Sequence, residues 1–148
     1  MRLPHLALPA LAITGAGAVL ARPTGETETV TTADARNLMA GGDVLICHAI
    51  FAGQRLHAHL TKPLFDVLEL FAFVKPGEPC LPSSLGLARA LHLDEPHTPE
   101  EAARVLHSAT SALFDAAAEL PPVPQQRALR GVRCTGSAEL RDLPQRRR

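Results

Sequence analysis

A long amphipathic helix in the last third of the chain is the feature that most constrains its fold. Thr98 can cap this helix, Pro99 suits its first position, and Glu101 stands three residues after the cap, as a capping box requires. From there to residue 120, apolar residues recur at helical spacing in one stripe: Ala102, Val105, Leu106, Ala109, Ala112, Leu113, Ala116 and Leu120. A helix with one apolar face must bury that face, so we expect the rest of the chain to supply a sheet for it to cover.

Short apolar or β-forming runs earlier in the chain predict the strands of that sheet. Residues 6–13 and 18–21 flank a turn rich in glycine, and residues 28–31 are rich in β-formers, so these three runs predict an antiparallel meander. The continuous apolar run 44–47 is typical of a strand covered on both faces. The run 64–74 is expected to begin as a brief strand and to continue as a helix.

Further helices are expected between these strands. Thr32 can cap a helix over 33–40 that stops at two glycines, a second helix is predicted over 52–60, and Ser83 or Ser84 can cap a third. We therefore predict an α/β fold with a mixed sheet, made of a three-strand antiparallel meander and short parallel strands, with helices packed on it. This domain is expected over residues 1–120, and the proline- and arginine-rich residues 121–148 are expected to be a linker or a disordered basic tail.

Charge and cysteine content narrow the function classes. The chain has 15 basic and 15 acidic residues, so it lacks the net positive charge of a dedicated nucleic-acid binder. Its three cysteines are far apart and odd in number, which indicates reduced thiols of a cytoplasmic protein rather than a disulfide framework or a zinc cage.

The N-terminus leaves one alternative open. Arg2 followed by an apolar stretch up to Leu20, with small residues at 19 and 21, has the outline of a secretory signal. Two prolines and two glycines interrupt this stretch, which is also too short and too broken for a membrane span. A small exported protein released after Ala21 is therefore the alternative to a cytoplasmic protein.

Several short patterns could carry chemistry but are incomplete. Gly15-x-Gly17 follows a predicted strand as in a dinucleotide-binding turn, yet Leu20 stands where a third small residue is needed, so we expect a plain β-turn. His57 and His59, and His48 beside Cys47, lack further ligands at recognisable spacing.

The remaining motifs have ordinary structural explanations. The serines at 83 and 84 are better explained as helix caps than as nucleophiles, and no P-loop is present. Asp66 and Glu69 are expected on a solvated helix face. We predict no catalytic residue, no metal-ligand set, no cofactor and no small-molecule substrate.

The order of these segments nevertheless resembles a known family. Residues 65–72, Phe-Asp-Val-Leu-Glu-Leu-Phe-Ala, are followed by a proline-bounded loop and by residues 84–91, Ser-Leu-Gly-Leu-Ala-Arg-Ala-Leu. Two further segments match the same family pattern more weakly: residues 47–49, Cys-His-Ala, and residues 106–110, Leu-His-Ser-Ala-Thr. This order resembles the DnaQ-type 3′–5′ exonucleases, and the resemblance implies a ribonuclease-H-like fold.

The departures from that family imply an inactive site. Where the family has its first pair of metal-binding carboxylates, this chain has Ala10 and Ala12; Gly53 and Ser108 replace two further aspartates, and Ala103 the general-base histidine. The two-metal chemistry of such nucleases requires these charges. An active nuclease with rearranged ligands would have to use Asp66, Glu69 and Asp115, and we rank that hypothesis last.

The sequence Asp-Val-Leu-Glu-Leu-Phe-Ala-Phe-Val-Lys-Pro, residues 66–76, also resembles the exonuclease-like N-terminal region of bacterial DinG-type ATP-dependent DNA helicases. This resemblance implies a catalytically inactive accessory domain that contacts DNA or a helicase motor domain, with the motor domains absent from this chain. The change after Pro121 to an unpatterned, arginine-ended tail would fit a truncated or frame-shifted copy, and a natural linker is the other explanation of this tail.

Overall fold

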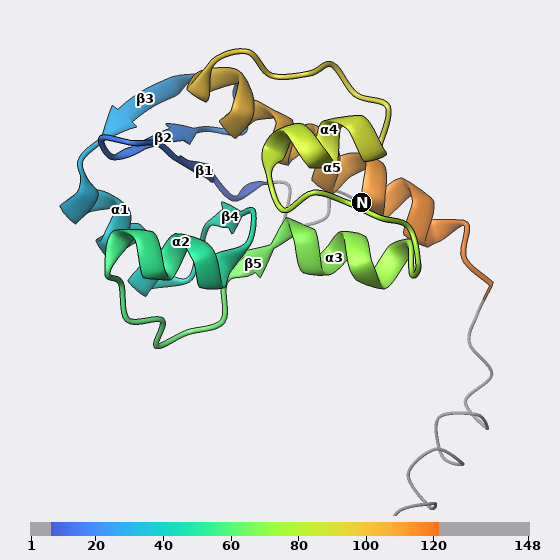
Figure 1. The fold of residues 1–148 in the computed structure, drawn as a ribbon, viewed down its shortest axis with the longest axis horizontal. Helices are drawn as coiled ribbons and strands as arrows, with labels where there is room; N and C mark the ends of the chain where they lie inside the picture. The colour runs from blue at the N-terminus through green and yellow to red at the C-terminus, as the bar shows by residue number, and fades with distance from the viewer. Residues whose placement is uncertain (1–6, 122–148) are drawn as a thin grey trace, which may run out of the picture.

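The centre of the molecule is a sheet of five short strands. A computed structural model describes residues 7–121 of the 148-residue chain and shows the strand order β3-β2-β1-β4-β5 (Figure 1). The meander β1-β2-β3 is antiparallel, whereas β4 is parallel to β1 and β5 is parallel to β4. The predicted mixed sheet is therefore confirmed, with the strands β1 Ala10–Ile13, β2 Ala18–Ala21, β3 Thr27–Val30, β4 Leu45–Ile46 and β5 Phe65–Asp66.

Gly15 and Gly17 lie in the turn of the hairpin that joins β1 to β2. The backbone N–H of Thr14 donates to the Gly17 carbonyl at 2.9 Å, which closes the turn from β1 to β2. A Cβ at Gly17 would lie 2.8 Å from the Val30 carbonyl oxygen, so only glycine lets the hairpin approach the end of β3 without a backbone shift. The prediction of a plain turn rather than a dinucleotide-binding loop is confirmed, because the chain continues directly into β2.

Five helices complete the described part of the chain, and their ends correct some of the predicted boundaries. Thr31, not Thr32, caps α1, and Gly42 ends this helix in the left-handed conformation with φ 85°. The helix predicted over 52–60 is shifted towards the N-terminus, because His57 takes the left-handed conformation (φ 51°) and stops it. The helices are α1 Thr32–Gly41, α2 Ala49–Leu56, α3 Val67–Val74, α4 Ser84–Ala90 and α5 Pro99–Ala118.

The long helix α5 forms as the sequence predicts. The Thr98 side chain accepts from the Glu101 backbone N–H, and the Glu101 carboxylate accepts from the Thr98 backbone N–H, which completes the capping box. Leu120, placed in the apolar stripe by its spacing, lies beyond the end of the helix and is 46% exposed. Two side chains of α5 reach the sheet: Arg104 donates to the Gly25 carbonyl, and a His107 ring nitrogen lies 2.8 Å from the Leu8 carbonyl oxygen.

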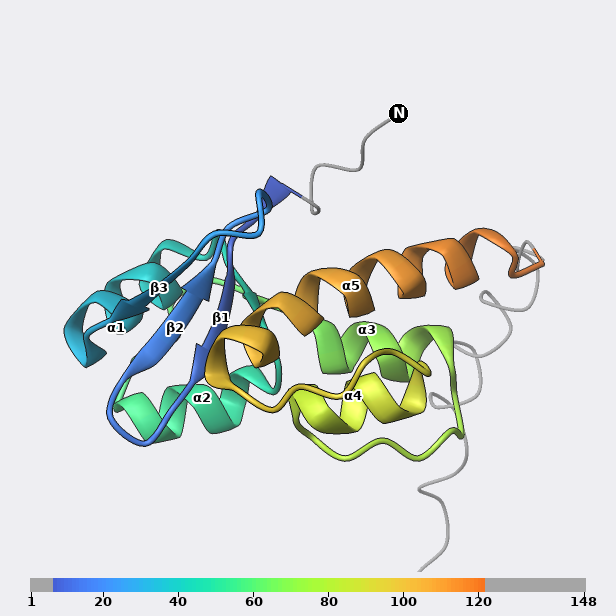
Figure 2. The same ribbon diagram turned by 90° about the horizontal axis from the view of Figure 1, so that it is seen from above.

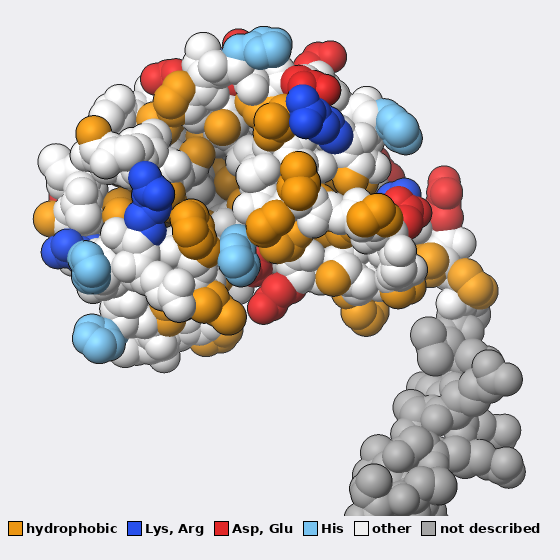
Figure 3. Space-filling model, in the orientation of Figure 1, with side chains coloured by type: hydrophobic (Ala, Val, Ile, Leu, Met, Phe, Trp, Pro, Cys, Tyr) orange, Lys and Arg blue, Asp and Glu red, His pale blue; other side chains and the backbone are white. Residues whose placement is uncertain are grey.

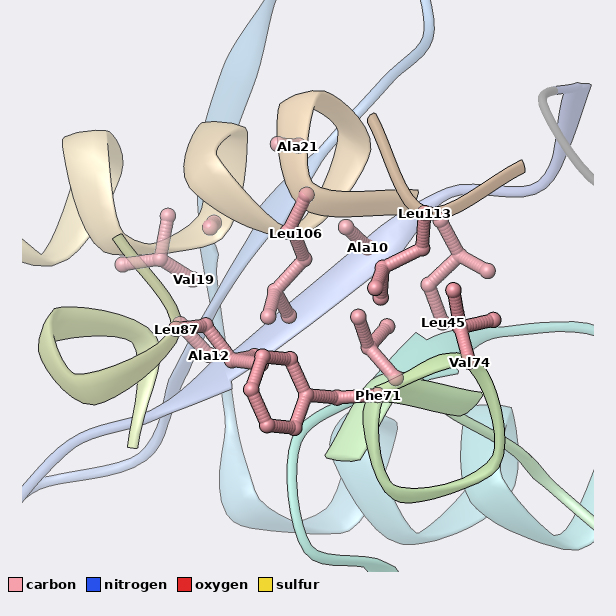
Figure 4. Close-up of a cluster of buried hydrophobic side chains, with 13 residues drawn as sticks. Ala10, Ala12, Val19, Ala21, Leu45, Phe71, Val74, Leu87, Leu106 and Leu113 are labelled. Atoms are coloured by element: carbon pink, nitrogen blue, oxygen red, sulfur yellow. The ribbon is translucent and has the colours of Figure 1, made fainter. Parts of the chain in front are cut away.

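Helices cover both faces of the sheet, and each face has its own core. Helices α3, α4 and α5 lie on one face and α1 and α2 on the other, as the rotated view in Figure 2 shows. The first core contains thirteen buried residues and is built around Phe71, Leu106 and Leu113 (Figure 4). The second contains nine, among them Met39 of α1 and Leu56 of α2.

The N-terminal segment that resembles a secretory signal forms part of the sheet. Residues 10–13 and 18–21 are the strands β1 and β2, and Ala10, Ala18 and Ala21 are fully buried. Cleavage after Ala21 would remove both strands from the sheet, so the fold described here requires them. Within residues 7–121, none of the helices is both long enough and apolar enough to span a bilayer. Residues 122–148, predicted to be a linker or tail, lie outside the described part of the chain.

Candidate functional site

A cleft lies where the parallel strands β1 and β4 end. After β1 the chain turns into the hairpin to β2, whereas after β4 it continues into α2 and on to β5, so the connections leave the two neighbouring strands in opposite directions. In open α/β sheets such a switch point, at the carboxyl ends of the strands, is the usual place for a ligand. The cleft has a volume of about 310 Å³. It is the candidate functional site of this chain on the basis of this position.

The walls of the cleft are built mainly from carbon. Ala12 and Ile13 come from the end of β1, Cys47 follows β4, Phe51 lies on α2 and Ala102 lies on α5. Ser83 and Ser84 supply hydroxyl groups, but the Ser83 oxygen already accepts from the Gly86 backbone N–H as the cap of α4, as predicted. No carboxylate lines the cleft within the described residues.

Cys47, the one ionisable residue among the described residues of this wall, stays neutral at neutral pH. Burial, together with the negative charge of Asp66 and the nearby Cys80 thiol, raises the pKa of the Cys47 thiol from its ordinary value of 9.0 to about 12. Burial also raises the pKa of Cys80. A thiol attacks electrophiles or binds metals as the thiolate, so Cys47 is not an activated nucleophile at neutral pH.

Asp66 is a structural anchor beneath the cleft. Its side chain is buried, and its two oxygens accept backbone N–H groups from His48 at 3.0 Å, Ala49 at 2.6 Å and Leu68 at 2.9 Å. The expectation that Asp66 lies on a solvated face is wrong, because these bonds satisfy the first turns of both α2 and α3. The sequence could have shown one part of this role, the capping of α3, because an aspartate directly before a helical run is a favoured N-cap.

The hydrogen bonds to Asp66 also prevent an anion from binding at the N-terminus of α2. His48, the residue before α2, takes the left-handed conformation with φ 60° and has no side-chain cap of its own. Its N–H and that of Ala49, which would otherwise face a bound anion, both donate to Asp66. The His48 ring instead stacks on Phe51, with ring centroids 5.9 Å apart and planes inclined by 2°.

The other charged candidates do not converge. Glu69 on α3 and Asp115 on α5 are exposed, whereas Asp66 is buried at the start of α3. His57 and His59 are exposed at and after the end of α2. Across residues 7–121, the structure brings together no group of three or more His, Cys, Asp or Glu side chains that could hold a metal ion.

The positions aligned with exonuclease carboxylates carry small groups in this structure. Ala10 and Ala12 belong to the core beneath α5, where Figure 4 draws them among the buried leucines. Gly53 borders a different groove on α2, and the residues of that helix that line the cleft are Phe51 and Ala52. Ala103 is fully buried and Ser108 is exposed, while Ala102 is the α5 residue at the cleft.

A larger groove of about 820 Å³ lies on the opposite side, between β3 and α1. Three of its charged side chains already have partners: Arg22 donates to Glu28 at 2.9 Å, and the Asp34 carboxylate accepts from the Thr31 hydroxyl at 2.7 Å. The Arg22–Glu28 pair joins the residue after β2 to β3, and the Thr31–Asp34 bond belongs to the N-terminal cap of α1. The groove does not lie at the carboxyl ends of the parallel strands. It is therefore a weaker candidate than the cleft.

Comparison of this chain with known protein families, curated proteins and solved structures found no match.

Proposed function

We propose that this chain is a catalytically inactive, ribonuclease-H-like accessory domain related to the front of an ATP-dependent DNA helicase, and that it docks instead of cutting. The observation that carries the proposal is the cleft at the ends of β1 and β4, whose walls contain no carboxylate within the described residues. Of the five positions that the resemblance assigns to metal ligands and the general base, Ala12 lines this cleft.

The sheet supports the fold assigned in this proposal. A ribonuclease-H-like domain is expected to combine an antiparallel meander with short parallel strands, and the chain has three strands of the first kind and two of the second. The segment that carries the strongest resemblance, residues 65–72, spans β5 and most of α3.

The chemistry of the cleft supports an inactive domain. Cleavage of a phosphodiester by two divalent cations requires several carboxylates to hold the cations around the reacting oxygens. Methyl groups at Ala12, Ala52 and Ala102 offer no lone pairs, and the Cys47 thiol remains protonated because its pKa is raised to about 12. Among the described residues, none that lines the cleft can replace these charges.

The charge of the described region favours a protein partner over DNA. Residues 7–121 contain 13 Asp and Glu but only 7 Lys and Arg, a net charge of −6 with neutral histidines. A surface of this sign repels phosphates, and affinity for DNA depends mainly on neutralising them. Docking to another protein, such as a helicase motor domain, is the function that this charge fits.

Paramagnetic NMR with Mn²⁺ tests the inactive site. We expect micromolar Mn²⁺ to leave the amide signals of residues 12, 13 and 47 of the ¹⁵N-labelled chain unbroadened, and single-stranded DNA to stay intact in Mg²⁺ or Mn²⁺. The double variant Ala12→Asp/Ser84→Asp places two carboxylates in the same cleft and serves as the matched control. Its signals around the cleft should broaden with Mn²⁺, because carboxylate oxygens are the ligands that this cation prefers.

Two results would overturn the proposal. The first is broadening of the cleft signals in the unmodified chain at the same Mn²⁺ concentration. The second is cutting of single-stranded DNA that a chelator abolishes and that survives re-purification of the chain.

A further inference from the structure

The outer side of α2 is an unusual apolar surface. Ile50 is 63% exposed, Phe51 48% and Leu60 39%, although side chains of this size are normally buried. A groove of about 470 Å³ runs between α2 and the segment 57–60, and most of its wall is carbon. We call Ile50, Phe51, Leu60 and this groove the α2 surface.

Backbone contacts hold the groove open. His57 ends α2 in the left-handed conformation, and the next residue folds back so that the Ala58 N–H donates to the Gly53 carbonyl at 2.9 Å. Leu60 then lies against Gly53, where an added Cβ would meet its side chain at 3.4 Å. These contacts define the course of the chain beside α2, and both Ile50 and Leu60 line the resulting groove.

The charge around the α2 surface differs from that of the rest of the domain. No Asp or Glu occurs from residue 44 to residue 65, whereas Arg55, Lys62 and three histidines do. Arg55, Lys62, His57 and His59 are all exposed. Over α2, Figure 3 shows hydrophobic side chains beside basic and histidine side chains. An apolar and locally basic surface thus lies on a domain whose described residues carry a net charge of −6.

We propose that the α2 surface binds an amphipathic helix of a partner protein, with large apolar side chains on one face of that helix and carboxylates along its edges. The apolar side chains would fill the groove between Ile50 and Leu60, and the carboxylates would pair with Arg55 and Lys62. Helices bound in this way insert apolar anchors into a groove and gain specificity from charges at the rim. This inference rests on the proposed docking function and names the surface and the partner chemistry.

Three other occupants fit the α2 surface less well: the C-terminal segment of this chain, a second copy of the chain, and single-stranded DNA. Residues 122–148 of the chain carry seven arginines and two acidic residues, so this segment would meet like charge on the α2 surface. A second copy docked through a two-fold axis would bring the same locally basic surface of both copies face to face, so cations would meet cations and histidines. Single-stranded DNA needs a row of cations along its phosphates and aromatic rings for its bases, whereas this surface has two permanent cations and mostly aliphatic side chains.

Titration of the full ¹⁵N-labelled chain with designed peptides tests the inference. The probe is an 18-residue helical peptide with leucine on one face and glutamate on the other, and the matched peptide has lysine in place of every glutamate. We expect the glutamate peptide to shift amide signals of residues 49–62 and to bind at least tenfold more tightly than the lysine peptide. Raising the salt concentration should narrow this difference, since the rim charges are solvent-exposed.

Variants locate the binding site. Ile50→Ser and Leu60→Ser should each weaken binding of the glutamate peptide at least tenfold and leave the circular dichroism spectrum unchanged, because both side chains are exposed. Phe73→Ser is the matched control: Phe73 is 76% exposed on α3, outside the α2 surface, and its loss should leave the affinity unchanged.

The inference fails if the glutamate peptide shifts no signals or shifts those of another surface, or if the lysine peptide binds equally well. It also fails if a twelve-residue oligothymidylate displaces the peptide, or if the chain self-associates in a way that Ile50→Ser abolishes. Metal-dependent cutting of DNA would overturn the proposed inactivity but would leave these peptide results intact, so the two failures are distinguishable.

Discussion

The two faces of the sheet differ in how completely they are covered. On the face of α3, α4 and α5, thirteen buried residues form one core, and α5 runs along β1 and β2. On the face of α1 and α2, the core has nine buried residues, and α2 leaves Ile50 and Phe51 exposed. The first face therefore carries the larger core, although Phe73 on α3 is also exposed, whereas on the second face the exposed Ile50 belongs to the surface for which we propose a partner.

The largest test of this comparison is a pair of leucine truncations. Leu106→Ala on α5 should lower the free energy of unfolding by about 3–5 kcal/mol, and Leu56→Ala on α2 by about 2–3 kcal/mol, because the thicker core collapses less easily around a cavity. Urea unfolding followed by far-ultraviolet circular dichroism measures both, since the chain has no tryptophan or tyrosine for fluorescence. If Leu56→Ala lowered the free energy of unfolding as much as Leu106→Ala or more, the two faces would not differ in how much they stabilise the fold.

The next test removes the carboxylate that joins the two faces. Asp66→Ala should cost about 2–4 kcal/mol of stability, because it leaves three backbone N–H groups without their acceptor. Glu69→Ala, three residues later on the exposed side of α3, should cost less than about 0.5 kcal/mol. Hydrogen exchange at His48, Ala49 and Leu68 should accelerate in the first variant alone; unchanged exchange there would show that Asp66 is not the anchor.

Two helical glycines, one for each face, should respond in opposite directions. A Cβ at Gly86 of α4 would lie 2.2 Å from the Leu81 carbonyl oxygen, so Gly86→Ala should lower stability by about 1–3 kcal/mol. Nothing lies within 4 Å of a Cβ at Gly41 of α1, so Gly41→Ala should raise stability by about 0.5–1 kcal/mol through helix propensity. Thermal unfolding measures both, and a stabilising Gly86→Ala would mean that α4 packs more loosely than described.

The smallest effect concerns Cys47, at the edge between the two cores. Its pKa is raised to about 12 in the folded chain, so the folded state keeps its proton above pH 9 while the unfolded state loses it. The stabilisation is complete below pH 9 and declines as the pH rises towards 12, by about 1 kcal/mol at pH 10. Cys47→Ala should show a shallower decline between pH 8 and pH 10; identical pH profiles would contradict a buried neutral thiol.

Local signals in the sequence predicted the elements that depend on neighbouring residues. The capping box at Thr98, the serine cap at Ser83 and the glycine stop at Gly42 form as predicted, because each depends on contacts within one turn. The prediction failed at α2, whose end is set by the left-handed His57 and whose start is held by Asp66 from another strand. Ala49 and Asp66 are 17 residues apart in the sequence, so their hydrogen bond leaves no local pattern from which it could be predicted.

For the candidate site, the sequence by itself determined the residue types available: alanines, a glycine and a serine stand at the positions that the proposed nuclease resemblance assigns to carboxylates. Only the tertiary structure decided which small residues line the cleft, that Asp66 is buried, and that Ile50, Phe51 and Leu60 remain exposed together. The physical reason is that residue chemistry is fixed one position at a time, whereas burial and neighbours depend on how strands and helices pack. Apolar spacing marks a face as suited to a core, but only packing decides whether this chain or a partner covers it.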